Sequence, residues 1–154
     1  MEIKSKFLGK QNVDPDTIIN FPKGLPGFED QTRFKLFHQE DNSIIYWLQS
    51  VDDEELTFSV TDPANFNINY SFILTDEEQA LLKLDNIEDL FILIILHTDE
   101  KNPGTGKPTI KGSIKSPVLI NAESRIGMQK SLAQIEQSIT LTEKNSEIDL
   151  QETV

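Results

Sequence analysis

Apolar and polar residues alternate along much of the N-terminal half of the chain, which is the pattern of β-strands with one buried face. The clearest alternation covers residues 56–61, where Leu56 begins a series of apolar side chains at every second position. Continuous apolar runs at 44–48 and 90–96 are typical of strands buried on both faces. We expect further strands at residues 2–7, 34–36, 68–74 and 118–120.

Turn-forming residues separate these segments at intervals of about ten residues, as in all-β barrels and sandwiches. One helix is predicted, because Thr75 and Glu78 have the spacing of a capping box. This helix should be short and end between Leu84 and Asn86. Residues 128–141 fit two patterns, since their apolar spacing is first helical and then alternating. The sequence therefore predicts an all-β fold with one short α-helix.

The length of 154 residues favours a single domain. We assign this domain to residues 1–142. Residues 143–154 hold four acidic residues and one basic residue, and we expect them to form a flexible acidic tail. The sequence has neither a leader-like segment nor an apolar run long enough to span a membrane, so the expected location is the cytoplasm.

Acidic residues outnumber basic residues by 26 to 14, which gives a formal net charge of -12. A field of this sign repels phosphate backbones and anionic membrane surfaces. Neither nucleic acid nor a membrane is therefore an expected partner. The charge fits a protein that meets a basic partner, although solubility alone is the more common reason for such a charge.

The sequence holds few groups that could carry catalysis or bind a metal. It has no cysteine and two histidines, so a zinc site, which needs at least three protein ligands, would have to use carboxylates as well. Residues 104–107 resemble a phosphate-binding loop, but Pro108 stands where that loop needs serine or threonine. Acidic clusters such as 52–55 fall in predicted turns, where carboxylates are normally solvated. We expect no enzyme activity, no metal and no cofactor, and a hydrolase using these clusters is the weakest hypothesis.

The segment from Phe21 to Phe28 is the most constrained loop of the chain. It holds two prolines, two glycines and three large apolar side chains within eight residues. Proline fixes backbone angles and glycine allows positive φ, so we expect one rigid shape with Gly24 or Gly27 at positive φ. Its apolar side chains either plug one end of the barrel or present a binding surface, and physical reasoning alone favours the plug.

This loop is also the first of several segments that resemble, in order and spacing, the FliW family of flagellar assembly factors. The resemblance covers residues 3–132. Its residues are Phe21, Pro22, Gly24, Leu25, Pro26, Gly27, Phe28 and Glu29 in the loop; Trp47, Leu48, Gln49 and Ser50; Phe58, Val60, Asp62, Pro63, Phe66 and Tyr70; Ser116, Pro117, Val118, Leu119, Ile120 and Asn121; and Gly127 and Gln129.

The resemblance implies a mostly antiparallel, small barrel-like domain that acts by binding. Members of the family bind flagellin as a chaperone before its export. They also bind and antagonise CsrA, a translational regulator that represses flagellin synthesis by binding messenger RNA. The acidic charge of this chain fits such a partner, because a protein that binds RNA needs a basic surface. The alternative is a generic β-barrel interaction module with a different partner.

Two sets of residues are candidates for contact with these partners. Apolar residues outside the clear strands are candidates for flagellin, because its amphipathic helices need an apolar groove. Acidic residues of one turn are candidates for steering CsrA. The apolar set is Leu25, Phe28 and Phe66, and the acidic set is Asp52, Asp53, Glu54 and Glu55.

Overall fold

The computed structural model describes residues 1–39, 42–70, 72–99, 109–132 and 138–141. Within these ranges the chain forms ten strands, one α-helix and three short 3-10 helices. The strands are β1 (Glu2–Ser5), β2 (Gly9–Asn12), β3 (Ile19–Asn20), β4 (Arg33–Gln39), β5 (Asn42–Ser50), β6 (Thr57–Thr61), β7 (Leu90–Asp99), β8 (Thr109–Asn121), β9 (Ile126–Gln129) and β10 (Ser138–Leu141). The helices are α1 (Asp76–Leu82), η1 (Pro15–Thr17), η2 (Pro63–Phe66) and η3 (Ile87–Asp89).

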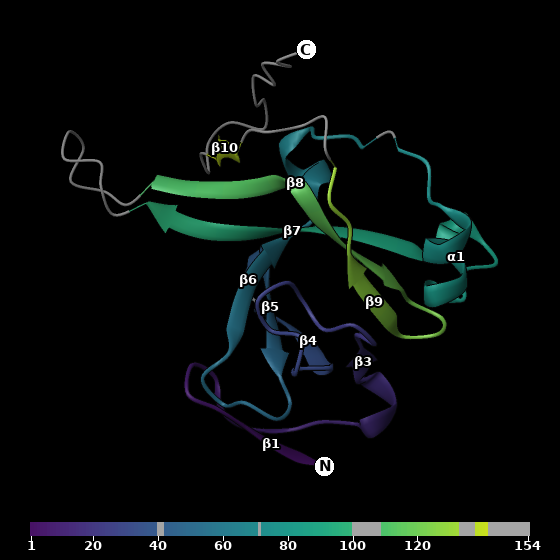
Figure 1. Ribbon diagram of the computed structural model, residues 1–154. Helices are drawn as coiled ribbons and strands as arrows, with labels where there is room; N and C mark the ends of the chain where they lie inside the picture. Colours follow the sequence, from purple (N-terminus) through teal and green to yellow (C-terminus); the bar gives the residue numbers. More distant parts are fainter. Residues whose placement is uncertain (40–41, 71, 100–108, 133–137, 142–154) are drawn as a thin grey trace.

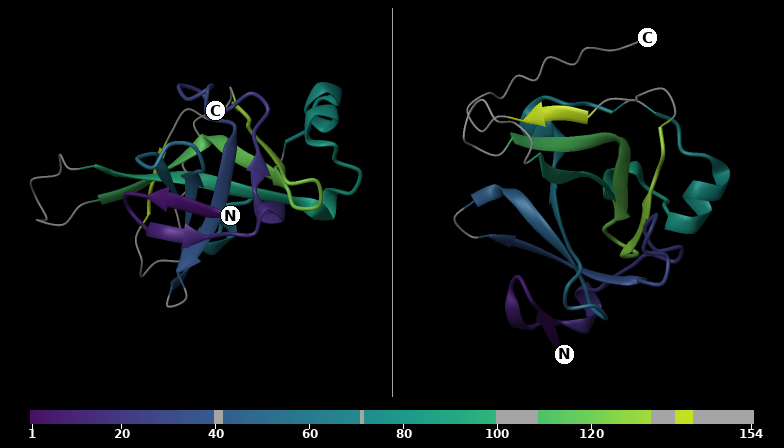
Figure 2. Two further views of the ribbon diagram at one scale, coloured as in Figure 1. Left: turned by 90° about the horizontal axis from the view of Figure 1, so that it is seen from below. Right: turned by 60° about the vertical axis from the view of Figure 1, so that its left-hand side comes forward.

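Seven of these strands close into a barrel, in the order β8, β7, β6, β5, β4, β3, β9 and back to β8. Its neighbours are antiparallel except β3 and β9, which pair in parallel at Asn20 and Ile126. β10 pairs with β8 outside this ring, and β1 and β2 form a separate hairpin beside the barrel (Figures 1 and 2). The predicted all-β, mostly antiparallel, barrel-like fold with one short helix is confirmed.

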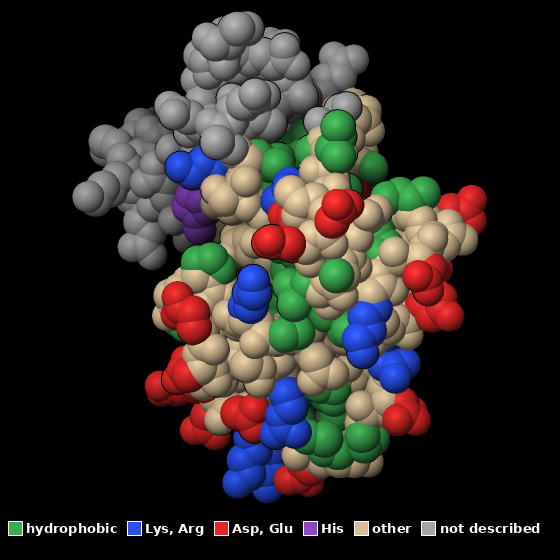
Figure 3. Space-filling view, turned by 45° about the vertical axis from the view of Figure 1, so that its right-hand side comes forward, with side chains coloured by type: hydrophobic (Ala, Val, Ile, Leu, Met, Phe, Trp, Pro, Cys, Tyr) green, Lys and Arg blue, Asp and Glu red, His purple; other side chains and the backbone are tan. Residues whose placement is uncertain are grey.

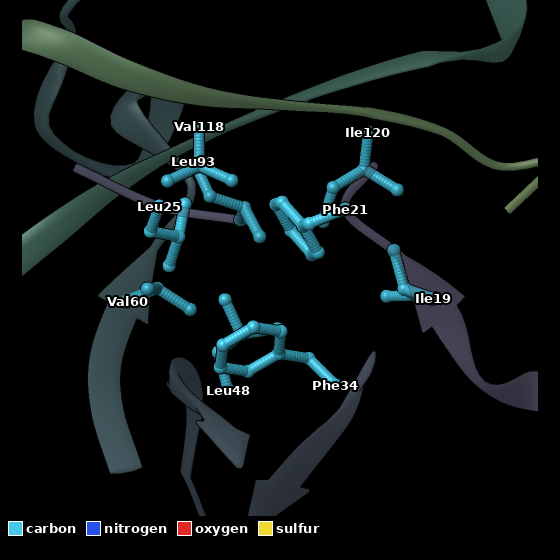
Figure 4. Close-up of a cluster of buried hydrophobic side chains, with 9 residues drawn as sticks. All are labelled: Ile19, Phe21, Leu25, Phe34, Leu48, Val60, Leu93, Val118 and Ile120. Atoms are coloured by element: carbon cyan, nitrogen blue, oxygen red, sulfur yellow. The ribbon is translucent and has the colours of Figure 1, made fainter. Parts of the chain in front are cut away.

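The barrel interior is filled by side chains from its strands and from the loop between β3 and β4. Phe21 and Leu25 of that loop are 0% and 1% exposed. The ring of Phe21 packs edge-on against Phe34, with 5.2 Å between centroids. The loop therefore plugs the barrel, as favoured from the sequence. Figure 4 shows the cluster, which comprises Ile19, Phe21, Leu25, Phe34, Leu48, Val60, Leu93, Val118 and Ile120.

Strand β7 is buried on both faces in its middle, as its continuous apolar run predicted. Leu93 belongs to the barrel interior, whereas Ile94 and Leu96 belong to a second cluster on the outer face. Phe66 and Ile68 cover that outer cluster. The run at 90–96 is thus shared between two cores.

The strand predicted at 68–74 is wrong. The described residues of this segment lie outside the sheet, and they begin after Asn67, whose positive φ of 58° ends η2. Strand β6 already pairs with β5 and β7, so neither of its edges is open to this segment. Ile68 and Tyr70 pack over β7 instead, and the Tyr70 hydroxyl donates to the Ile114 carbonyl at 2.6 Å. Burial raises the pKa of Tyr70.

Two further expectations changed in detail. The first strand ends at Ser5, so Phe7 falls in the following turn and is 63% exposed. Residues 128–129 belong to β9 and residues 138–141 to β10, whereas residues 130–132 form neither helix nor strand, so the described part of this segment follows the alternating interpretation only at its ends. The predicted tail at 143–154 lies outside the described residues, and the boundary at 142 stays a prediction.

The predicted capping box is present at the start of α1. The Glu78 N–H donates to the Thr75 hydroxyl at 3.1 Å, and the Thr75 N–H donates to the Glu78 carboxylate at 2.9 Å. The helix ends at Leu82, two residues before the expected range, because Lys83 takes a left-handed φ of 52°. The Asn121 amide holds this end by donating to the Leu82 carbonyl at 2.8 Å.

An ion pair holds the other end of α1 against the barrel. The Lys130 ammonium lies 2.6 Å from the Glu78 carboxylate, and both side chains are largely buried. Burial raises the pKa of Glu78, but hydrogen bonds from Lys130 and the Thr75 backbone outweigh it, and the pKa lies below its ordinary value of 4.5. The stabilisation is therefore complete above that ordinary value and is lost as the pH falls through the lower folded-state pKa.

We expect Glu78→Gln to lower the melting temperature near neutral pH, because it removes this ion pair. The difference from the unsubstituted protein should shrink as the pH falls below about 4. Melting curves recorded at several pH values check this. Glu77→Gln, an exposed neighbour in the same helical turn, is the control and should have little effect. A difference that is constant across the pH range would contradict the prediction.

Gly24 and Gly27 both have positive φ, of 64° and 88°, as predicted. A Cβ at Gly24 would lie 2.6 Å from the Cα of Glu29, whereas a Cβ at Gly27 would meet no atom within 4 Å. We expect Gly24→Ala to cost about 3 kcal/mol or more, and Gly27→Ala about 1 kcal/mol from φ strain alone. Denaturant unfolding measures both, and equal costs would show that the close approach at Gly24 does not matter.

Candidate protein-binding site

The loop at residues 21–28 is held by backbone hydrogen bonds at its base and its tip. The Phe21 N–H donates to the Thr32 carbonyl and the Gly24 N–H to the Phe21 carbonyl, each at 2.8 Å. At the tip, the Phe28 N–H donates to the Leu25 carbonyl at 2.7 Å. With Leu25 buried, this tight turn directs Phe28 outward, where it is 38% exposed.

A groove of about 510 Å³ lies beside this loop. The ring of Phe28 packs edge-on against Phe58 of β6, with 5.4 Å between centroids. Ile95 of β7 also lines the groove, and residues of β8 and Gln129 of β9 complete it. The groove is thus an apolar, partly open site at the junction of the loop and the sheet.

The acidic turn at 52–55 is fixed by two ion pairs. Asp52 accepts two hydrogen bonds from the Arg33 guanidinium, one of them at 3.1 Å. The hydrogen bond from Arg33 lowers the pKa of Asp52. Glu55 pairs with Lys6 at 3.0 Å, and both of these side chains are exposed. The turn is therefore acidic, partly neutralised by its neighbours and open to solvent.

Gln49 shapes this turn from beneath. Its side chain is fully buried, and its carbonyl oxygen accepts hydrogen bonds from the hydroxyls of Ser5 and Thr57. Its amide donates to the carbonyls of Ser50 and Asp53, each at 3.0 Å. All donors and acceptors of a buried amide are thereby used, and the β1–β2 hairpin is tied to the barrel.

The other motif residues also have structural partners. Asp62 accepts from the Ala64 N–H at 2.9 Å and caps η2, and Pro63 is buried behind it. The Ser50 hydroxyl accepts from the Asp53 N–H at 3.0 Å. The Gln129 amide donates to the Ser116 carbonyl at 2.8 Å. These motif residues therefore stabilise turns and strand ends of the fold, and Gln129 also lines the groove.

The three apolar candidates differ in their exposure to solvent. Leu25 is 1% exposed and lies in the barrel core, and Phe66 is 8% exposed in the second cluster. Phe28 is the member of this set that offers apolar surface. Figure 3 shows one face of the molecule, on which hydrophobic side chains reach the surface between scattered acidic and basic side chains.

Sequence reasoning missed a second exposed aromatic site. Phe7 packs at a tilt against Trp47, with 5.5 Å between ring centroids. Together with Lys6, Glu55 and polar residues of β6 they line an open groove of about 360 Å³. The position of Phe7 in an alternating strand pattern predicted burial, and the early end of β1 is what exposes it. The neighbouring Gly9, with a φ of 77°, was the available signal for a turn.

Metal-binding groups are not gathered anywhere in the described part of the chain. Among its residues, no three histidine, aspartate or glutamate side chains lie close enough to hold an ion. No helix in the same ranges has the length and apolar character needed to cross a membrane.

The fold and these surfaces define a class: a small closed β-barrel domain with two open grooves lined by aromatic side chains. The sequence model of the family described as "FliW protein" matches residues 2–143. The "Flagellar assembly factor FliW" of Azoarcus sp. (strain BH72) is 37% identical over 145 residues, covering 94% of this chain and 99% of the relative. That of Chromobacterium violaceum is 38% identical over 138 residues, covering 85% and 92%.

The chain belongs to the FliW family of flagellar assembly factors. The resemblance seen in its ordered motifs is thereby confirmed. A solved structure entitled "Crystal structure of the flagellar assembly factor FliW" superposes with a TM-score of 0.77 and covers 92% of this chain and 95% of that chain. At 24% identity this match supports the fold.

Gln49→Ala tests the buried amide beneath the acidic turn. It removes four hydrogen bonds at once: two that the amide donates to the carbonyls of Ser50 and Asp53, and two that it accepts from the hydroxyls of Ser5 and Thr57. Because these bonds are buried or partly buried, we expect a loss of about 3 kcal/mol. Gln11→Ala is the control, because it removes one partly buried hydrogen bond to the Leu8 carbonyl and should cost less than about 1 kcal/mol. Urea unfolding measures both, and similar costs would contradict the assigned role of Gln49.

Proposed function

We propose that this protein binds flagellin as a chaperone and binds and antagonises CsrA, which relieves repression of flagellin synthesis. It acts in the cytoplasm, by binding alone, without enzyme activity, metal or cofactor. Family membership supports a role in flagellar assembly, since the relatives are named as flagellar assembly factors. The observation that carries the proposal is the apolar groove walled by Phe28 and Phe58, directly beside the first motif of the family.

Charge supports the second partner. The net charge is -12, and the turn at 52–55 exposes carboxylates on a rigid base formed by Gln49. A regulator that binds messenger RNA carries basic surface, because phosphate contacts dominate RNA affinity. Opposite charge raises the rate of encounter and orients the partners. The same charge disfavours direct contact of this protein with nucleic acid or with an anionic membrane.

A generic β-barrel interaction module with a different partner is the second candidate. One observation favours it: most motif residues are buried and bonded within the chain, so the motifs account for the fold without specifying a partner. Titration of the purified protein with purified flagellin and with purified CsrA decides between the two candidates. Binding of neither would overturn the proposed function.

The two partners should respond differently to salt. We expect CsrA affinity to fall steeply once salt exceeds physiological strength, where the Debye length is about 8 Å and shrinking. Flagellin affinity should change less, because apolar burial is not screened. Titration calorimetry of each partner over a salt series measures both slopes. Equal slopes would contradict this division.

A charge reversal tests whether the acidic turn provides the electrostatic contribution to CsrA binding. Glu54→Lys should weaken CsrA binding, because Glu54 is exposed within the acidic turn. Glu88→Lys makes the same charge change at an exposed position of η3, and it should have a smaller effect. If both reversals weaken binding equally, net charge rather than the turn attracts CsrA.

A further inference from the structure

The groove beside the 21–28 loop owes its shape to an irregular stretch of β8. Leu93 pairs with Val118 and Ile95 pairs with Ser113, so β8 accommodates residues 114–117 opposite Ile94 alone. Bulges of this kind bend a strand and redirect its side chains, and they are frequent beside functional sites. Pro117 lies in this stretch, where no ladder hydrogen bond is required of its nitrogen.

Hydrogen bonds from the segment after β9 and from Gln129 fix residues 115–117 of this stretch. The Lys130 N–H donates to the Pro117 carbonyl at 3.0 Å, and the Leu132 N–H donates to the Lys115 carbonyl at 2.6 Å. The Gln129 side chain holds the Ser116 carbonyl between them. Lys115 therefore lines the groove from a rigid backbone while its side chain stays exposed.

The charged side chain in the groove is opposite in sign to the net charge of the chain. Lys115 lines the groove, and among its described lining residues none is acidic, although the chain has 26 acidic and 14 basic residues. Lys115 forms no ion pair with a described residue, unlike Lys6 and Lys130, which are paired with carboxylates. An unpaired ammonium group beside Phe28 and Phe58 is complementary to a ligand that is apolar and carries a carboxylate.

We propose that this groove binds an acidic amphipathic peptide segment of a partner protein, with large apolar side chains against Phe28 and Phe58 and a carboxylate against Lys115. The segment's apolar residues fill the space between loop and sheet, and the carboxylate fixes its register. The proposal rests on the proposed function in one respect: the segment belongs to the partner held by apolar contact, not to the basic regulator.

A pair of designed peptides tests the charge preference. The first is a capped helical peptide of about 14 residues with leucines at i, i+3, i+4 and i+7 and flanking glutamates. The second has lysines in place of the glutamates. We expect the acidic peptide to bind at least about tenfold more tightly, as fluorescence anisotropy measures. Amide chemical-shift changes should cluster at Phe28, Ile95 and Ser113. Changes centred on Trp47, or equal affinities, would overturn the proposal.

Variants then assign the preference to single residues. Lys115→Glu should weaken the acidic peptide about tenfold and strengthen the basic one, whereas Lys10→Glu, exposed on β2, should leave both within about twofold. Phe28→Ala should weaken both peptides, and Phe91→Ala, at another exposed aromatic position, neither. Circular dichroism confirms that each variant is folded, and Lys115→Gln replaces Lys115→Glu if that variant unfolds. No change with either variant at Lys115 refutes the proposal.

Binding measurements with full-length flagellin and CsrA distinguish a failure of the groove assignment from a failure of the proposed function. If flagellin binds the unsubstituted protein and Lys115→Glu leaves that affinity unchanged, the groove assignment fails and the proposed function stands. If the acidic peptide binds as described but neither flagellin nor CsrA does, the groove assignment stands and the proposed function fails.

Discussion

The contact between Phe21 and Gly127 is the constraint on which the barrel depends. A Cβ at Gly127 would lie 2.5 Å from the ring of Phe21, so the ring occupies the space that any larger residue would need. Gly127 sits on β9, the strand that joins β3 to β8 and closes the barrel. A loop residue thus fills the interior and at the same time sets which residue the closing strand must carry.

The burial of one part of the loop exposes the other. Because Phe21 and Leu25 point into the core, the remaining residues of the loop must turn back within a few positions. Gly24 makes this turn at positive φ, against the backbone of Glu29. Phe28 is then left at the surface against Phe58. Plugging the barrel and presenting an apolar surface look like alternatives in the sequence. In the structure both follow from one rigid turn.

Local sequence patterns were sufficient to predict an element that is stabilised by local contacts, such as a capped helix. They were also sufficient for a strand whose buried and exposed side chains alternate clearly. The alternation over 56–61 and the capping box at Thr75 both correspond to real elements. The pattern at 68–74 failed because alternation reports which side chains are buried, not whether a neighbouring strand has an open edge. Ile68 is indeed buried, but under η2 and over β7.

The candidate site shows the same limit. Phe28 and the acidic turn could be named from the sequence, because they belong to a motif and a charge cluster. The groove could not be named, since it requires the irregular pairing of β8 through which Lys115 and Ile95 line the same groove, and nothing local in the sequence marks that pairing. Leu25 and Phe66 were named for the same reason as Phe28, and only their packing shows that they face inward.

Strand β6 places the two exposed grooves on opposite faces of one element. Phe58 lines the groove beside the loop, while its neighbours Thr57 and Ser59 line the groove of Phe7 and Trp47. The two grooves share no lining residue. Competition between two partners of this protein would therefore need footprints wider than either groove, or an element with two packed arrangements that each partner biases differently.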